Sequence, residues 1–104
     1  MPEILQTRAA EESRLNIWLH VARDNIAAAD RLLDAIDDKC RLYAAQPEMG
    51  DIRPDLGEMV RCFPVGNYVV LYRPIQDGIL VLLVIHGARD IPAVLRHLRG
   101  LTDV

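Results

Sequence analysis

The run from Arg61 to Asp90 limits the possible folds more than any other part of this 104-residue chain. It contains short apolar segments joined by tight turns, a pattern typical of antiparallel strands. The apolar segments are 59–63, 68–73 and 79–85, and the turns are 64–67 and 76–78. The third segment is apolar throughout, which predicts a strand that is buried on both faces. We expect Pro74 to limit pairing after the second strand and Gly78 to adopt a positive φ.

The first half of the chain predicts a short extended segment at Glu3–Gln6 and then two helices. Thr7 and Asn25 are suitable N-caps for these helices, and Pro47 ends the second one at Gln46. The expected buried stripe of the first helix is Leu15, Trp18, Leu19 and Ala22, widened by Ile17 and Val21. The expected stripe of the second is Ala29, Leu32, Leu33, Ile36, Cys40 and Tyr43.

This order of elements predicts an α+β fold in a single domain that spans residues 1–104. We expect an N-terminal strand, an antiparallel helical hairpin, a three-stranded antiparallel meander packed on the hairpin, and a short C-terminal helix at 92–98. The segment 47–58 is predicted to be a loop, because Gly50, Pro54 and Gly57 interrupt it. Cys40 and Cys62 are expected to be buried and reduced.

Several functional classes lack their usual motifs. The sequence shows no metal, phosphate-loop, dinucleotide or nucleophile-elbow pattern, so we expect no cofactor and no metal. No secretory leader is visible, and the longest apolar run, Ile79–Ile85, is too short to cross a bilayer. We therefore expect a cytoplasmic protein that does not contact membranes. The net charge is −3, but all six basic residues of the second half are arginines, which suit pairing with carboxylates or phosphates.

Two sets of polar or aromatic residues allow more than one interpretation. His86 follows the most apolar strand and lies near Arg89, so it is either a general base or simply the end of that strand. Tyr68 and Tyr72 are four residues apart on one predicted strand and therefore share a face. They either pack against the hairpin, which we favour, or form an aromatic surface.

The segment MVRCFPVGNYVVLYRPIQDGILVLLVIHGARDIPAVL resembles the C-terminal signature of ParE toxins, in the ParE/RelE superfamily of toxin–antitoxin systems. The matching features are Arg61, FPVG at 63–66, Tyr68, YR at 72–73 and HGARD at 86–90. The helical half resembles the family more loosely, and Arg14 stands where the family usually has an acid. The resemblance extends over nearly the whole chain.

The resemblance implies a growth-arresting toxin that binds DNA gyrase and serves plasmid stabilisation. It also implies neutralisation by a ParD-like antitoxin in a hetero-oligomer. Activity of this kind is inhibition by protein binding, which favours an inhibitor over an enzyme. The residues expected to contact the antitoxin or the target are Arg61, Tyr68, Arg73, His86 and Arg89.

The alternative within the same superfamily is a RelE-like, ribosome-dependent mRNA endonuclease. Alignment with such enzymes places their strand cations at Val60, Cys62 and Val69, and only Arg89 matches a basic catalytic position. The missing cations argue against direct nucleic acid binding. His86 together with Arg89 keeps the nuclease hypothesis open. A third possibility is an inactive toxin that matters only within its antitoxin complex.

Overall fold

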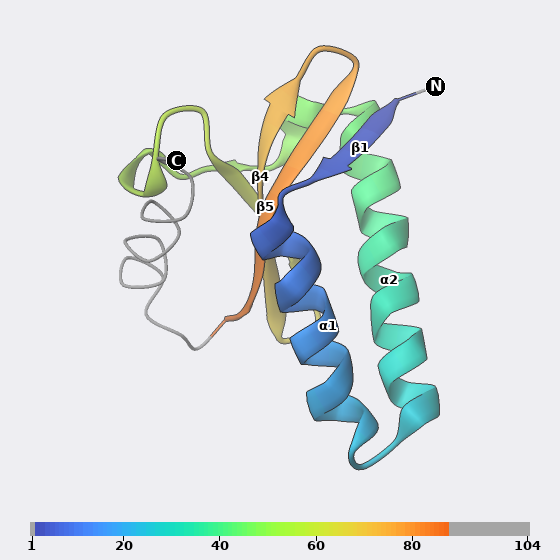
Figure 1. Ribbon diagram of the computed structural model, residues 1–104. Coiled ribbons are helices and arrows are strands. Elements are labelled where there is room, and N and C mark those ends of the chain that lie inside the picture. The colour runs from blue at the N-terminus through green and yellow to red at the C-terminus, as the bar shows by residue number, and fades with distance from the viewer. Residues whose placement is uncertain (1, 88–104) are drawn as a thin grey trace.

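Five strands form one mixed sheet in the computed structural model, which describes residues 2–87 (Figure 1). The strand order is β1-β5-β4-β3-β2, with β1 parallel to β5 and the other neighbours antiparallel. The elements are β1 (Glu3–Gln6), α1 (Arg8–Ala22), α2 (Ile26–Ala45), β2 (Asp51–Ile52), β3 (Arg61–Val65), β4 (Tyr68–Ile75) and β5 (Gly78–His86). The α+β class is confirmed. The predicted helix at 92–98 lies outside the described residues.

The sheet is larger than the predicted meander. Strands β3, β4 and β5 form the antiparallel meander, while β1 pairs with β5 at one edge and β2 pairs with β3 at the other. The prediction of a loop throughout 47–58 is wrong at β2, where Asp51 pairs with Cys62 and Ile52 with Arg61. Two residues are too few to produce a detectable period of apolar residues, so the sequence gives no sign of this strand.

Helix α2 packs its apolar stripe against the sheet, as its periodicity predicts. The stripe residues are buried or pack on the core, and Ala44, one turn after Cys40, is also buried. The ring of Tyr43 stacks on Phe63 of β3, with 4.1 Å between the ring centroids, and Tyr72 is tilted beside both. Tyr68 also packs against this cluster. The expectation that Tyr68 and Tyr72 pack beneath the hairpin is therefore confirmed.

The predicted buried face of helix α1 is wrong at Leu15 and Leu19 but right at Ile17, which is buried. Leu15 is 57% exposed and Leu19 is 47% exposed, whereas Ala10 and Ile17 are the buried residues of this helix. Two side chains that were expected to contact the sheet therefore lie on the outer side of α1. The helix carries apolar residues around most of its circumference, so their spacing does not identify the side that faces the sheet.

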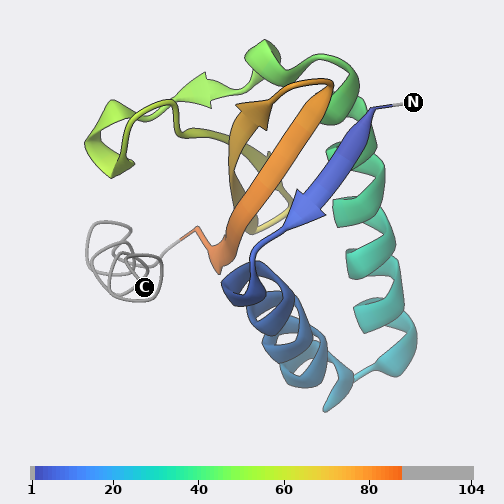
Figure 2. The same cartoon turned by 45° about the horizontal axis from the view of Figure 1, so that its top comes forward.

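The contacts of α1 with β5 explain which side is buried. Strand β1 ends at Gln6, opposite Val81, and α1 begins beside the next part of β5 (Figure 2). The Thr7 hydroxyl donates to the carbonyl of Leu82 (2.8 Å), and the Ser13 hydroxyl accepts from the amide of Val84 (3.1 Å). The side chains of Thr7 and Ser13 thus form hydrogen bonds to the backbone of β5 that a neighbouring strand would otherwise form. Such short side chains reach the strand only if the helix lies close to it, which favours small residues at the contact.

The expected helix boundaries are confirmed. The Thr7 side chain accepts a hydrogen bond from the amide of Ala10, and the Asn25 side chain accepts one from Ala28. Each bond satisfies one of the amides that the first turn of a helix leaves unpaired. Helix α2 ends one residue before Gln46.

Two details of the second turn differ from expectation. The positive φ is at Asp77 (61°), and Gly78 instead lies where a Cβ would come within 2.0 Å of the Glu3 carbonyl oxygen. Pro74 does not limit pairing, because β4 continues beyond it to Ile75. On one side Pro74 pairs with Ile79 of β5, and on the other side the β3 ladder already ends at Arg61 and Tyr72, so pairing there does not depend on the missing N–H of Pro74.

The face of the sheet opposite the helices carries a second apolar cluster. Its buried members are Leu56, Val60, Cys62, Leu71, Leu83 and Ile85. Strand β5 therefore has buried residues on both faces, as its uniform apolar sequence predicts. The two cysteines are buried and not bonded to each other, which is also as expected. No helix within residues 2–87 combines the length and apolar character needed to cross a bilayer.

Candidate binding site

Tyr68 and His86 lie side by side at one end of the sheet. They are direct cross-strand partners on β4 and β5, and their rings meet edge to face with 5.4 Å between the centroids. Tyr68 is half-buried, while His86 is exposed and is the last residue of β5. Pairs of this kind combine apolar contact area with polar groups, which suits recognition of another protein.

Arg61 holds the loop between α2 and β2. Its Nη1 donates to the carbonyls of Glu48 and Gly50, both at 2.9 Å. The Tyr72 hydroxyl donates to the carbonyl of Pro47 (2.6 Å) and accepts from the amide of Gly50 (3.0 Å). Burial raises the pKa of Tyr72, so its hydroxyl keeps the proton that it donates. Arg61 is thus engaged in fixing this loop, whatever further contacts it makes.

Arg73 lies on the face of the sheet opposite the helices. It follows the inward-pointing Tyr72 on β4 and is exposed. Its cross-strand partner is Leu80, which in turn pairs with Leu5 of β1. Leu5 is 48% exposed. Arg73 therefore lies at the end of an accessible row whose other members are apolar, an arrangement that suits an acidic, partly apolar partner segment.

The structure does not bring all the predicted site residues together. Tyr68 and Arg73 are separated by roughly 17 Å along β4, taking about 3.4 Å per residue. Arg61 lies near Arg73 along the sheet but on the opposite face, because its partner is the buried Tyr72. Arg89 lies outside the described residues. A binding role for these residues remains a prediction, and it would require a partner that contacts both ends of the sheet.

Apolar residues occupy the positions aligned with nuclease cations. Val60 and Cys62 are buried, and Val69 packs against the same cluster on the face away from the helices. Burial raises the pKa of the Cys62 thiol, and the nearby Arg53 guanidinium offsets this only in part. Arg53 itself forms two hydrogen bonds to Asp55, at 3.0 and 2.8 Å. None of the three aligned positions presents a charge to solvent.

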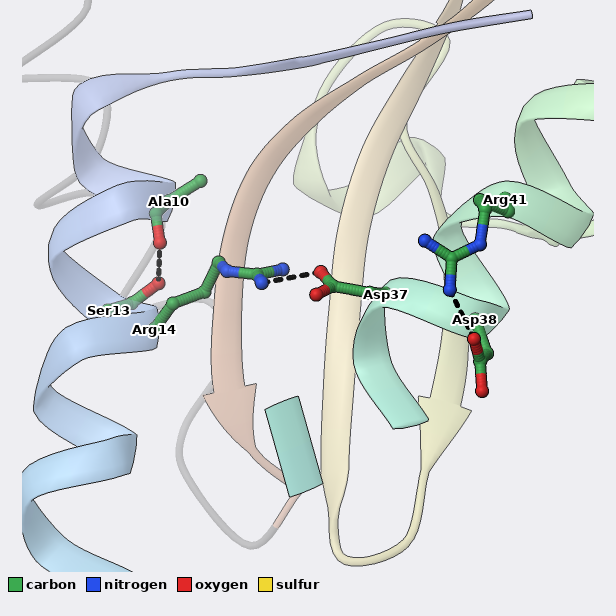
Figure 3. A network of polar contacts seen from close by, with 6 residues as sticks. All are labelled: Ala10, Ser13, Arg14, Asp37, Asp38 and Arg41. Carbon is green, nitrogen blue, oxygen red and sulfur yellow. Dashed lines mark hydrogen bonds and ion pairs between the residues drawn. The ribbon is translucent and has the colours of Figure 1, made fainter. Parts of the chain in front are cut away.

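Arg14, which replaces the usual acid of the family pattern, forms an ion pair between the two helices. Its Nη2 lies 2.5 Å from Oδ1 of Asp37 on α2 (Figure 3). The neighbouring Asp38 pairs instead with Arg41 on its own helix. An acid at position 14 would place two like charges together, so the arginine suits this particular α2 sequence.

A surface groove lies where the helical hairpin meets the sheet. It has a volume of about 680 Å³ and lies between α2 and the turn that joins β3 to β4. Its lining residues are Ala35, Asp38, Lys39, Leu42, Pro64, Val65 and Gly66. The sequence feature that points to this position is Leu42, an exposed leucine outside the α2 stripe that lines the groove. Within the part of the chain that the structure describes, no three His, Cys, Asp or Glu residues gather in a way that could hold a metal ion.

Residues 4–91 match the family pattern of the ParE toxins of type II toxin–antitoxin systems, parDE. The chain belongs to the ParE toxin family. A solved structure with a similar fold is a chain described as "Chromosomal ParDE TA system from P. aeruginosa". It aligns with a TM-score of 0.68 and 19% identity, over 83% of this chain and 96% of that one, and at this identity the likeness concerns the fold alone. No curated protein matches the sequence of this ParE-family chain.

Proposed function

We propose that this ParE-family toxin arrests growth by binding DNA gyrase, and that a ParD-like antitoxin neutralises it in a hetero-oligomeric complex. The activity is inhibition through protein contacts, without cleavage of nucleic acid. Family membership supports the toxin class, and the P. aeruginosa neighbour is described as part of a ParDE system.

The observation that carries the inhibitory mechanism is that Val60 and Cys62 are buried and that Val69 is half-buried against the same apolar cluster. A nuclease of the RelE type needs cations there to stabilise the charge that develops on the scissile phosphate. Here these side chains belong to an apolar cluster, where an unpaired cation would be costly to desolvate. The overall charge of −3 also disfavours binding to a polyanion.

Supercoiling by purified gyrase in the presence of the toxin tests this proposal. We expect the toxin to inhibit supercoiling, and the antitoxin encoded beside its gene to restore it. Translating ribosomes treated with the same preparation should retain intact mRNA. Full supercoiling activity at a large excess of folded toxin would contradict the gyrase proposal.

The competing function is mRNA cleavage with His86 as an acid or base. The observation in its favour is the exposed position of His86, in ring contact with Tyr68. Substitution His86→Ala separates the two functions. Because His86 is a predicted contact of the binding surface, its loss should weaken gyrase inhibition by about tenfold at most, whereas loss of a catalytic acid or base lowers a rate by about 10²–10⁴. Ribosome-dependent cleavage that disappears in His86→Ala would establish the nuclease.

Arg73→Ala tests the predicted antitoxin contact. We expect the Kd for the antitoxin to rise by about three- to tenfold, because the variant loses one ion pair at a protein interface. Arg31→Ala, on the exposed side of α2, is the matched control and should leave the Kd unchanged. Equal affinities of the two variants, measured by calorimetry, would remove Arg73 from the interface.

A further inference from the structure

The segment 47–60, which connects α2 to β3, carries the acidic excess of the whole chain. It holds four acids and a single base, whereas the chain has 15 acids and 12 bases in total, so the remaining residues are balanced. The base is Arg53, which pairs with Asp55. The other three acids are exposed and form no ion pair with any residue among 2–87: Glu48, Asp51 and Glu58. This segment therefore presents a negative surface.

Three large apolar side chains are exposed on the same segment. The exposed fractions are 43% for Met49, 64% for Ile52 and 62% for Met59. All three lie around Arg61, which donates to the carbonyls on either side of Met49, pairs across the strands with Ile52 and follows Met59 by two residues. Exposed apolar side chains that gather in one place mark a contact with another molecule.

The backbone beneath these side chains is held in one conformation. Hydrogen bonds from Arg61 fix residues 48–50, and the amide of Arg53 donates to the carbonyl of Val60 (2.8 Å). Met59 has a positive φ of 63°, which residues other than glycine rarely adopt unless the surrounding contacts impose it. Backbone strain of this kind is concentrated at functional sites. A surface that is ordered before binding also loses less entropy on binding.

A groove of about 560 Å³ opens beside Met49. Its lining is apolar at Pro47, Met49, Pro74 and Ile75, and Glu48 supplies a carboxylate. Lysine and arginine side chains have apolar stems and charged ends, so they match a groove of this composition. The groove is therefore suited to a basic side chain of a partner.

We propose that the 47–60 segment is the surface through which this toxin binds gyrase, at a part of gyrase where basic side chains surround an apolar centre. This inference rests on the proposed function. An enzyme that acts on DNA must hold a polymer with one negative charge for about every 1.7 Å of its axis, so gyrase needs basic surfaces. The acids and the apolar side chains of the segment complement such a surface.

The negative charge of the segment makes three other occupants less favourable. Nucleic acid is itself negative, and a two-fold contact between copies of the chain would bring identical acids together. The antitoxin segment that suits Arg73 is acidic, so the 47–60 segment would repel it. A basic protein surface is the occupant that gains from both the acids and the groove.

Serine substitutions test the apolar part of the surface. Ile52→Ser combined with Met59→Ser changes two exposed side chains, so the Kd for purified gyrase should rise about tenfold or more and inhibition of supercoiling should weaken in proportion. Leu15→Ser combined with Leu19→Ser makes the same kind of change on α1, where the side chains are 57% and 47% exposed, and should leave both values unchanged. Thermal unfolding of the free variants identifies any loss of structure. Equal affinities of the two folded variants would overturn the proposal.

Charge reversal tests the acidic part and does not depend on the serine variants. Glu48→Lys places a positive charge at the groove, and Asp34→Lys makes the same change on the exposed side of α2. Only Glu48→Lys should weaken binding to gyrase, by about tenfold at low salt. The Kd of the natural toxin should rise between about 50 and 200 mM salt, and this rise should be smaller in Glu48→Lys. An equal response to salt in the natural toxin and both variants would contradict the charge complementarity on which the proposal depends.

Antitoxin binding separates this inference from the proposed function. The serine variant of the segment and Glu48→Lys should bind the ParD-like antitoxin encoded beside the gene with the Kd of the natural toxin. A matching loss of antitoxin affinity would assign the segment to the antitoxin and overturn the inference. If the natural toxin inhibits gyrase and the two segment variants inhibit it equally well, the inference fails alone. If the natural toxin does not bind gyrase, the proposed function fails as well.

Discussion

Helices α1 and α2 cover the same face of one sheet but bury very different side chains (Figure 1). Helix α2 presents a continuous apolar stripe, with Ile36 and Cys40 fully covered. Helix α1 presents Ala10 and Ile17 together with the polar Ser13 and Arg14, whose contacts reach β5 and α2. One helix is held mainly by apolar contact, and the other depends on close approach and specific polar bonds.

This difference shows when apolar spacing identifies the buried side of a helix. Apolar spacing identifies the buried side of α2, because the outer side of that helix is mostly charged and only the apolar side can face the sheet. It fails for α1, because both sides carry apolar residues and the contact with β5 requires small ones. Within residues 2–87, Leu15 and Leu19 are therefore exposed and are not part of the hydrophobic core.

Truncating one aliphatic residue on each helix should give the largest contrast. Ile36→Ala removes a side chain that is fully buried under α2, so the free energy of unfolding should fall by about 2–5 kcal/mol. Leu19→Ala removes a side chain that is 47% exposed on α1, and should change stability by no more than about 0.5 kcal/mol. Urea unfolding with an unchanged m-value measures both. Similar losses in the two variants would mean that the outer side of α1 is covered in solution.

Most of the fold follows from local signals in the sequence. Apolar spacing predicts α2, uniform apolarity predicts the buried β5, and the capping residues Thr7 and Asn25 give both helix starts. The remaining features depend on contacts between distant segments. Two-residue β2 exists only because β3 lies beside it, and the role of Gly78 depends on the approach of Glu3. No local pattern encodes such contacts.

Cys40 lies on the apolar side of α2, so the pH dependence of stability should show whether that side is closed to solvent. Burial raises the pKa of Cys40 from 9.0 to about 11, with a smaller lowering by Arg14 and a smaller further raising by Asp37. The unfolded chain thus releases the thiol proton at lower pH than the folded chain does. The stabilisation is complete below about pH 9 and is lost as the pH rises toward 11, by about 1.4 kcal/mol per unit.

Cys40→Ala is the control for this titration. Both proteins contain Cys62 and Tyr72, whose pKa values are also raised by burial, so their effects cancel in the comparison. Between pH 9 and 10 the natural chain should lose about 1 kcal/mol more stability than Cys40→Ala in urea unfolding. Parallel pH profiles would show that the thiol of Cys40 is not protected from solvent.

The candidate site was less predictable than the fold. The sequence identifies Tyr68, Arg73 and His86 as unusual residues on strands, but it does not give the face or end of the sheet where each lies. Arg61 shows why sequence alone does not locate a site. Its side chain donates to the carbonyls of Glu48 and Gly50, which belong to a loop that lies more than ten residues earlier in the chain.

The smallest expected effect concerns the polar contact that sets the position of α1. Ser13 donates to the carbonyl of Ala10 and accepts from the amide of Val84, so Ser13→Ala leaves that partly buried amide without its acceptor. We expect a loss of about 1 kcal/mol, reduced by the better helix propensity of alanine. Asn16→Ala, at an exposed position on the same helix, is the control and should not destabilise the chain. Hydrogen exchange at Val84 sharpens the test: if α1 acts as the neighbour of β5 through this hydroxyl, exchange there should accelerate in Ser13→Ala and stay slow in Asn16→Ala.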